Sequence, residues 1–146
     1  MTTKKELAEI KRGIREQDAW RTVDRRCYSI FMHMKEKAEE LKRSGEIDFD
    51  VDDLRQKVHA LIGEPCLWCS KKLTPKSFCL DHSIPLSRGG TFALSNLSVP
   101  CSSCNGKKGN LKPDEFIRLQ TLLSEFPPEA RGDIMTRLGV GGRWKR

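Results

Sequence analysis

Four cysteines, arranged in two close pairs, are the residues whose type and spacing most directly predict chemistry. Cys66 and Cys69 form one C-x-x-C pair and Cys101 and Cys104 form the other, with 31 residues between the pairs. Each pair can place two thiolates on one tight turn, and two such turns complete the tetrahedral sulfur cage that Zn²⁺ prefers. Because four cysteines would fill the coordination sphere, we expect this zinc to support the fold and not to take part in a reaction.

Other uses of the cysteine pairs fit the sequence less well. Disulfides are typical of exported chains, and this N-terminus is charged from its start, without the apolar core of an export signal. A redox C-x-x-C motif would not need two pairs. An iron–sulfur cluster stays open as the less favoured alternative. Cys27 and Cys79 lie outside the pairs, and we expect both to be ordinary buried thiols.

A second group of side chains, between and beside the cysteine pairs, could carry out hydrolysis. Asp81 and His82 are adjacent at the end of a short strand predicted over residues 77–82, with Pro85 soon after, so both side chains could reach one cleft. Asp81 and Asn105 offer the carboxylate and amide oxygens that suit Mg²⁺ or Mn²⁺. A neutral His82 imidazole beside such a metal could activate water near neutral pH. Together these groups make metal-assisted phosphodiester hydrolysis feasible.

The stretch from Cys66 to Gly109 resembles an HNH endonuclease of the ββα-metal type, in its four-cysteine zinc form. The Asp81–His82 pair, the central Asn96, the two C-x-x-C pairs and an N-x-x-K tail at 105–108 occur in the family's order. The resemblance therefore implies an α+β fold, in which a zinc-stapled ββα-metal core holds a nuclease site. It covers about a third of the chain.

The resemblance also implies a role for each matching residue. His82 matches the general base, and Asn96 matches the asparagine whose side chain bonds across the ββ loop and holds the backbone of the histidine. Asn105 stands where the name-giving members have a second histidine, as it does in phage junction resolvases and in the HNH domains of RNA-guided nucleases. In those enzymes this residue binds the catalytic metal together with the aspartate before the base, here Asp81. Lys108 matches a basic residue near the scissile phosphate.

The activity implied by the resemblance is a metal-dependent DNA endonuclease that leaves 5′-phosphate and 3′-hydroxyl ends. One active site cuts one strand, so a monomer should nick its substrate. Four basic residues are candidates for contacts with the DNA backbone: Arg88, Lys107, Lys108 and Lys112. The alternative from another class is a catalytically inactive, zinc-stapled nucleic-acid-binding module. A weaker alternative is a coiled-coil adaptor. The presence of Asp81, His82 and Asn105 together favours the enzyme.

Helical segments flank the predicted core at 63–112. In residues 1–62, apolar residues recur at steps of three and four up to a stop at Ser44–Gly45, and a second helix is predicted after Asp50. Residues 113–146 predict two further helices and a basic tail at 141–146. The heptad-like spacing in the first helix leaves a homodimer open. Because neither flank contains a recognisable DNA reader, a protein partner could supply specificity.

Charge and hydropathy support this interpretation. The chain has 27 Lys and Arg against 20 Asp and Glu, and of the net charge of +7, residues 63–112 carry +5. Such a local positive field suits nucleic acid. No apolar stretch approaches the ~20 residues of a membrane span, so we expect no membrane partner and a location in the cytoplasm or nucleoid. The module serves phages, mobile elements and restriction alike, so the sequence does not specify the pathway.

Overall fold

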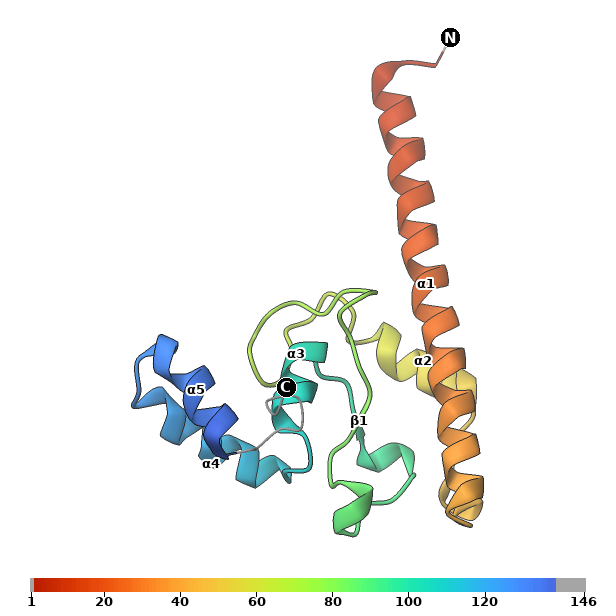
Figure 1. The fold of residues 1–146 in the computed structure, drawn as a ribbon. Coiled ribbons are helices and arrows are strands. Elements are labelled where there is room, and N and C mark those ends of the chain that lie inside the picture. Colours follow the sequence, from red (N-terminus) through yellow and green to blue (C-terminus); the bar gives the residue numbers. More distant parts are fainter. Residues whose placement is uncertain (1, 139–146) are drawn as a thin grey trace.

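The computed structural model of the protein describes residues 2–138. Within them, five α-helices and one two-stranded sheet occur in the order α1 (Lys4–Glu40), α2 (Val51–His59), β1 (Asp81–His82), β2 (Leu97–Ser98), α3 (Ser102–Lys108), α4 (Pro113–Ser124) and α5 (Pro128–Leu138) (Figure 1). Short 3₁₀ turns lie at Ser44–Glu46, Leu86–Arg88 and Leu94–Asn96. The expected α+β class is confirmed. The predicted basic tail at 141–146 lies outside the described residues.

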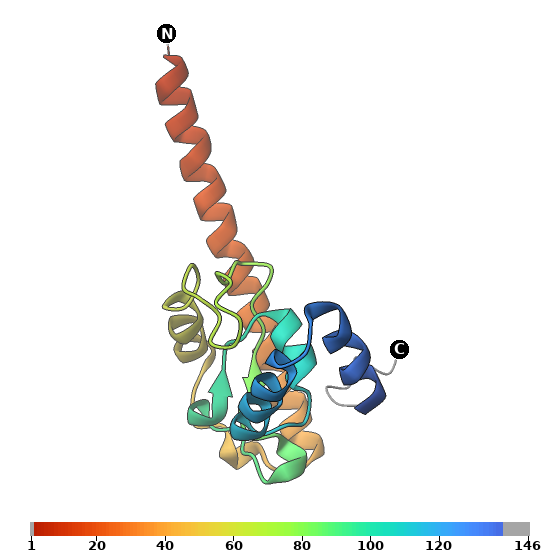
Figure 2. The same ribbon diagram turned by 90° about the vertical axis from the view of Figure 1, so that its left-hand side faces the viewer.

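Helix α1 is one continuous helix. It begins with a capping box, in which the Thr3 hydroxyl accepts from the Glu6 N–H and the Glu6 carboxylate accepts from the Thr3 N–H. Its second half packs on α2 and buries a face made of Val23, Cys27, Met34 and Ala38. Its first half extends away from the rest of the chain (Figure 2), and three apolar side chains on it are about half exposed: Leu7, Ile10 and Ile14.

The end of α1 differs from the sequence prediction. The helix stops at Glu40 and not at Ser44–Gly45, which form part of a 3₁₀ turn. The chain leaves the helix through Lys42, whose φ of 55° lies in the left-handed region, and the Arg43 N–H bonds back to the Ala38 carbonyl at 2.7 Å. This reversal turns residues 43–48 back toward the middle of the protein.

Helix α2 begins where the sequence predicts. The Asp50 carboxylate accepts from the N–H groups of Asp52 and Asp53, and the Asp53 carboxylate accepts from the Asp50 N–H. Leu54 and Val58 are fully buried against α1. Helices α1 and α2 therefore form one apolar layer, and their buried side chains continue into the core beneath the cysteine pairs.

The sheet is shorter than the predicted strand at 77–82. Strands β1 and β2 pair antiparallel with Asp81 opposite Ser98 and His82 opposite Leu97. Pairing continues beyond β1 only as an isolated bridge between Phe78 and Cys101. Helix α3 follows β2 directly, so the chain has the ββα order that the resemblance implied.

Arg26 of α1 attaches the N-terminal layer to the cysteine-containing segment. Its guanidinium donates to the carbonyl oxygens of Pro75 at 2.6 Å and Phe78 at 2.7 Å. The same group lies 4.1 Å from the centre of the Phe78 ring, which is fully buried. Helices α4 and α5 lie on the opposite side of α3 from α1 (Figure 1). No helix within residues 2–138 combines the length and apolarity of a membrane span.

Candidate functional site

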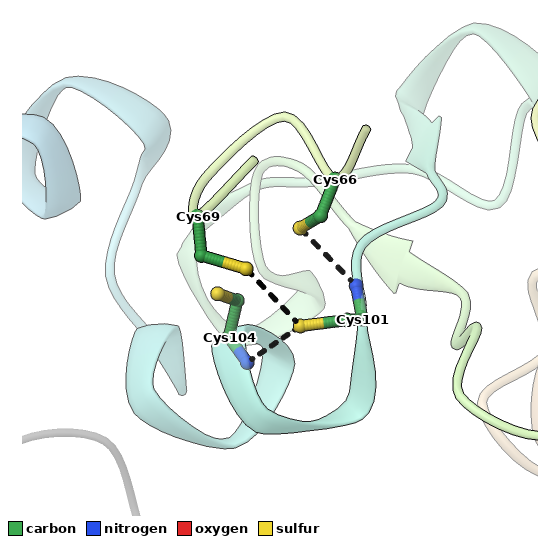
Figure 3. A group of neighbouring side chains, drawn as sticks. All are labelled: Cys66, Cys69, Cys101 and Cys104. Atoms are coloured by element: carbon green, nitrogen blue, oxygen red, sulfur yellow. Dashed lines mark hydrogen bonds between the residues drawn. The ribbon is translucent and has the colours of Figure 1, made fainter. Parts of the chain in front are cut away.

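The four paired cysteines meet at one point between the loop at 66–69 and the start of α3. Their sulfur atoms all lie within 4.8 Å of one another (Figure 3). The Sγ atoms of Cys69 and Cys101 are 3.8 Å apart, which matches the edge of about 3.8 Å expected for a tetrahedron with Zn–S bonds of about 2.3 Å. The cysteines are therefore arranged to hold a metal, and four sulfur donors in this geometry fit Zn²⁺.

Backbone N–H groups prepare the Cys66 sulfur for metal binding. Burial would raise the pKa of the Cys66 thiol, but N–H groups of Cys101 and Trp68 point at the sulfur, and together with a further backbone bond they lower that pKa to about 7. The thiolate is the form that binds metal. Trp68 also packs its ring against Phe116 of α4, with ring centres 5.1 Å apart, so α4 contacts the loop that carries the first cysteine pair.

Asp81 and His82 lie on β1 at the wall of an open cavity of about 340 Å³. Pro85 and Leu86 from the loop after β1, and Gly109 and Asn110 from the end of α3, also line this cavity. The Nε2 atom of His82 is buried and makes no hydrogen bond to any described residue. An imidazole nitrogen without a hydrogen-bond partner keeps its lone pair available to accept a proton.

The surroundings of His82 favour its neutral form. Burial lowers the pKa of the imidazole below its ordinary value of 6.5, the Asp81 carboxylate opposes this shift, and the positive charges of Arg43 and Lys108 act with burial. The Phe92 ring packs edge to face against the imidazole, with centres 5.4 Å apart and planes at 86°. These contacts thus favour the neutral imidazole beside a carboxylate.

The Asp81 carboxylate already contacts a cation. Lys108, at the end of α3, is fully buried, and its Nζ lies 2.8 Å from Asp81 Oδ2. Asn105 lies three residues earlier on α3, and positions i and i+3 share a helix face. The Asp81 carboxylate thus already pairs with a positive charge, whereas Asn105 is not among the residues that line the cavity at Asp81 and His82.

Asn96 ties the loop after β1 to the loop before β2. Its side-chain nitrogen donates to the carbonyl oxygens of Ile84 at 3.0 Å and Thr91 at 2.9 Å, and its side-chain oxygen accepts from the Ile84 N–H at 3.0 Å. Its own carbonyl accepts from the Ser83 N–H at 2.8 Å. These bonds hold the backbone directly after His82, which is the arrangement the resemblance implied.

The four basic residues expected to contact DNA differ in how strongly other protein groups already hold them. Arg88 forms a two-pronged ion pair with Glu115 of α4 and also donates to the Asn110 carbonyl at 3.3 Å. Lys112 caps α4, and its N–H donates to Glu115 at 2.9 Å. Lys107 is exposed, whereas Lys108 is buried at Asp81. In this structure Lys107 is thus the least constrained of the four.

Three residues around the loop beside His82 could not be predicted from the sequence. Arg43, Glu46 and Phe92 contact one another and the loop beside the imidazole. Arg43 and Glu46 precede the predicted core by many residues and belong to no motif. Their contacts depend on how the end of α1 folds back, which periodicity does not reveal.

Comparison with known proteins agrees with this geometry. Residues 66–120 match the family model described as HNH endonuclease. The match includes both cysteine pairs, both β-strands and α3. No curated protein matches the chain.

Proposed function

Because residues 66–120 of this chain match the HNH endonuclease family model, we propose that the protein is a metal-dependent DNA endonuclease. The observation that carries this proposal is the buried Nε2 of His82. His82 lies beside Asp81 on the wall of one open cavity, and its buried Nε2 makes no hydrogen bond to a described residue. A nitrogen in this state can act as the general base that takes a proton from the attacking water.

The residues of the site divide the work of phosphodiester hydrolysis. Asp81 and Asn105 would hold one divalent cation, Mg²⁺ or Mn²⁺, which when bound supplies charge stabilisation at the phosphate and at the leaving oxygen. His82 takes the proton of the attacking water, and Asn96 keeps the backbone after His82 in place. Attack of this water on phosphorus, with the 3′ oxygen as the leaving group, leaves a 5′-phosphate and a 3′-hydroxyl. The four cysteines, with zinc, hold the start of α3 and so the face that carries Asn105.

A single site of this kind cuts one strand, so we propose that a monomer nicks DNA. Lys107 and Lys112 are the proposed contacts with the phosphate backbone, and Lys108 is proposed to lie near the scissile phosphate. Arg88, expected from the sequence as a fourth contact, is held by Glu115. Specificity would come from a protein partner, or from a second copy bound through the exposed first half of α1.

Cleavage of supercoiled plasmid tests the proposal. Purified protein is incubated with Mg²⁺, Mn²⁺ or EDTA, beside His82→Ala and a control variant, His33→Ala, which removes an exposed histidine from α1. We expect metal-dependent open circle from the wild type and from His33→Ala, and none from His82→Ala. Linear product at early times would indicate paired sites instead of a nicking monomer.

One outcome of this experiment would contradict the proposed nuclease activity. Folded protein with one zinc per chain that cleaves neither duplex nor branched DNA with either metal would overturn the proposal. Binding of those DNAs in a gel-shift assay by the same protein would then identify a zinc-stapled nucleic-acid-binding module without catalytic activity.

A further inference from the structure

Residues 43–48, which precede the matched region, contact the loop at 90–94 beside His82. The Arg43 guanidinium donates to the Gly90 carbonyl at 2.5 Å. The Glu46 carboxylate accepts from the Phe92 N–H at 3.1 Å and from Arg43 Nε at 2.8 Å. Two side chains from one short segment therefore bind two alternate residues of the loop and also bind each other.

The contacts extend past Phe92 along the loop. The Asp48 carboxylate accepts from the Leu94 N–H at 2.8 Å. Lys57 of α2 donates to the Leu94 carbonyl at 3.2 Å. The loop is thus held along one side by side chains from outside the matched HNH region.

The opposite side of this loop is equally confined. A Cβ atom on Gly90 would lie 1.8 Å from the Ile84 carbonyl oxygen, so the loop backbone packs directly on the chain that follows His82. Asn96 bonds to both Ile84 and Thr91 across this contact. The loop cannot move away from residues 43–48 without also disturbing the segment after the base.

Phe92 connects the restrained loop at 90–94 to the His82 imidazole. It is fully buried, and the Arg43 guanidinium lies 5.3 Å from the centre of its ring. The same ring also packs edge to face on His82. Because His82 Nε2 makes no hydrogen bond to a described residue, packing against Phe92 limits where that nitrogen points.

We propose that Arg43, Glu46 and Phe92 are positioning residues for His82, so that the segment 43–48 after α1 completes the nuclease site. This inference rests on the proposed function, since it assigns a task to residues around the same base. A general base must be held close to its productive geometry, and a misplacement of about 1 Å can cost roughly 100-fold in rate. Residues outside the family's matched region would thus set the rate of the reaction.

Arg26 supplies a matched control for Arg43. Both are arginines of the N-terminal segment that donate to backbone carbonyls of the matched region or the loops beside it, and both stack on a fully buried phenylalanine. Only Arg43 acts on a ring that touches His82. We expect Arg43→Ala to lower kcat roughly 10- to 100-fold with KM for DNA unchanged. Arg26→Ala should keep kcat at a temperature where both variants are folded and zinc-loaded.

A second readout does not depend on activity. The chain has three histidines, so the ring protons of His82 can be assigned by NMR. Phe92→Leu should remove the ring-current shift that Phe92 imposes on them, and Arg43→Ala should move those resonances toward the Phe92→Leu positions, whereas Arg26→Ala should not. If Arg43→Ala does not fold, Glu46→Gln replaces it, because this variant keeps one acceptor oxygen and loses the charge. It should lower kcat and move the His82 resonances in the same direction as Arg43→Ala, but by a smaller amount.

The results distinguish the proposed nuclease activity from the positioning role of Arg43, Glu46 and Phe92. A wild-type protein without nuclease activity in which Arg43→Ala still shifts the His82 resonances would overturn the proposed function and keep the contact. An active wild type in which Arg43→Ala and Arg26→Ala change kcat equally, or in which neither shifts the resonances, would overturn the positioning role alone.

Discussion

Lys108 Nζ lies 2.8 Å from Asp81 Oδ2, and the lysine side chain is completely buried. Removing one member of such a buried pair leaves an uncompensated charge, which costs about 3–5 kcal/mol. The lysine occupies the carboxylate that the proposed metal requires. Lys108 and the metal would compete for the Asp81 carboxylate. The apparent metal affinity therefore equals the intrinsic affinity multiplied by the fraction of protein in which Asp81 is not held by Lys108.

Replacement of Lys108 should therefore strengthen metal binding. We expect Lys108→Met to bind Mn²⁺ about tenfold more tightly, equivalent to about 1.4 kcal/mol, as measured by electron paramagnetic resonance. It should also melt at a lower temperature without metal and recover more stability from Mn²⁺ than the wild type. Lys107→Met makes the same change at the exposed neighbouring residue and should leave both properties unchanged. Equal Mn²⁺ affinity in the two variants would exclude competition by Lys108.

Removal of zinc should unfold the nuclease core. In small zinc domains the metal contributes on the order of 10 kcal/mol to folding. Cys69→Ser, at the exposed ligand, should lower the zinc content and abolish the cooperative thermal transition of the core, followed by circular dichroism and metal analysis. Cys27→Ala removes a buried thiol of α1 and should cost only about 1 kcal/mol while keeping one zinc per chain. Full zinc content in Cys69→Ser would contradict the four-cysteine site.

The zinc site and the family could be predicted because short contiguous patterns encode them. Two C-x-x-C pairs predict a four-sulfur site whatever the rest of the fold does, and the structure and the family match confirm it. Strand length could not be predicted, because within the expected strand at 77–82 only Asp81 and His82 form a ladder, and Phe78 makes an isolated bridge. The surroundings of His82 could not be predicted either. Arg43 and Glu46 contact the loop beside His82 only because the chain reverses at Lys42.

The rate of cleavage should stay high below the pH at which an ordinary histidine gains its proton. Burial lowers the pKa of His82 from 6.5, so the neutral base persists to lower pH, and the acid limb of the kcat/KM profile should lie below 6.5. The stability linked to His82 is complete above pH 6.5 and is lost as the pH falls toward the lowered folded value, because the unfolded chain then binds the proton more readily. An acid limb at or above 6.5 would contradict a buried neutral base.

Arg88 should contribute little to DNA affinity because Glu115 already holds it. The Arg88 guanidinium, followed by the Lys112 N–H, lowers the pKa of the Glu115 carboxyl to about 2, so this ion pair persists at every pH used for binding assays. Each phosphate contact contributes about 0.9 to the slope of log affinity against log salt. Lys107→Gln should reduce that slope by about this amount, and Arg88→Gln should leave it unchanged. An equal loss in Arg88→Gln would mean that Arg88 leaves Glu115 to bind phosphate, and Glu115→Gln should then strengthen DNA binding.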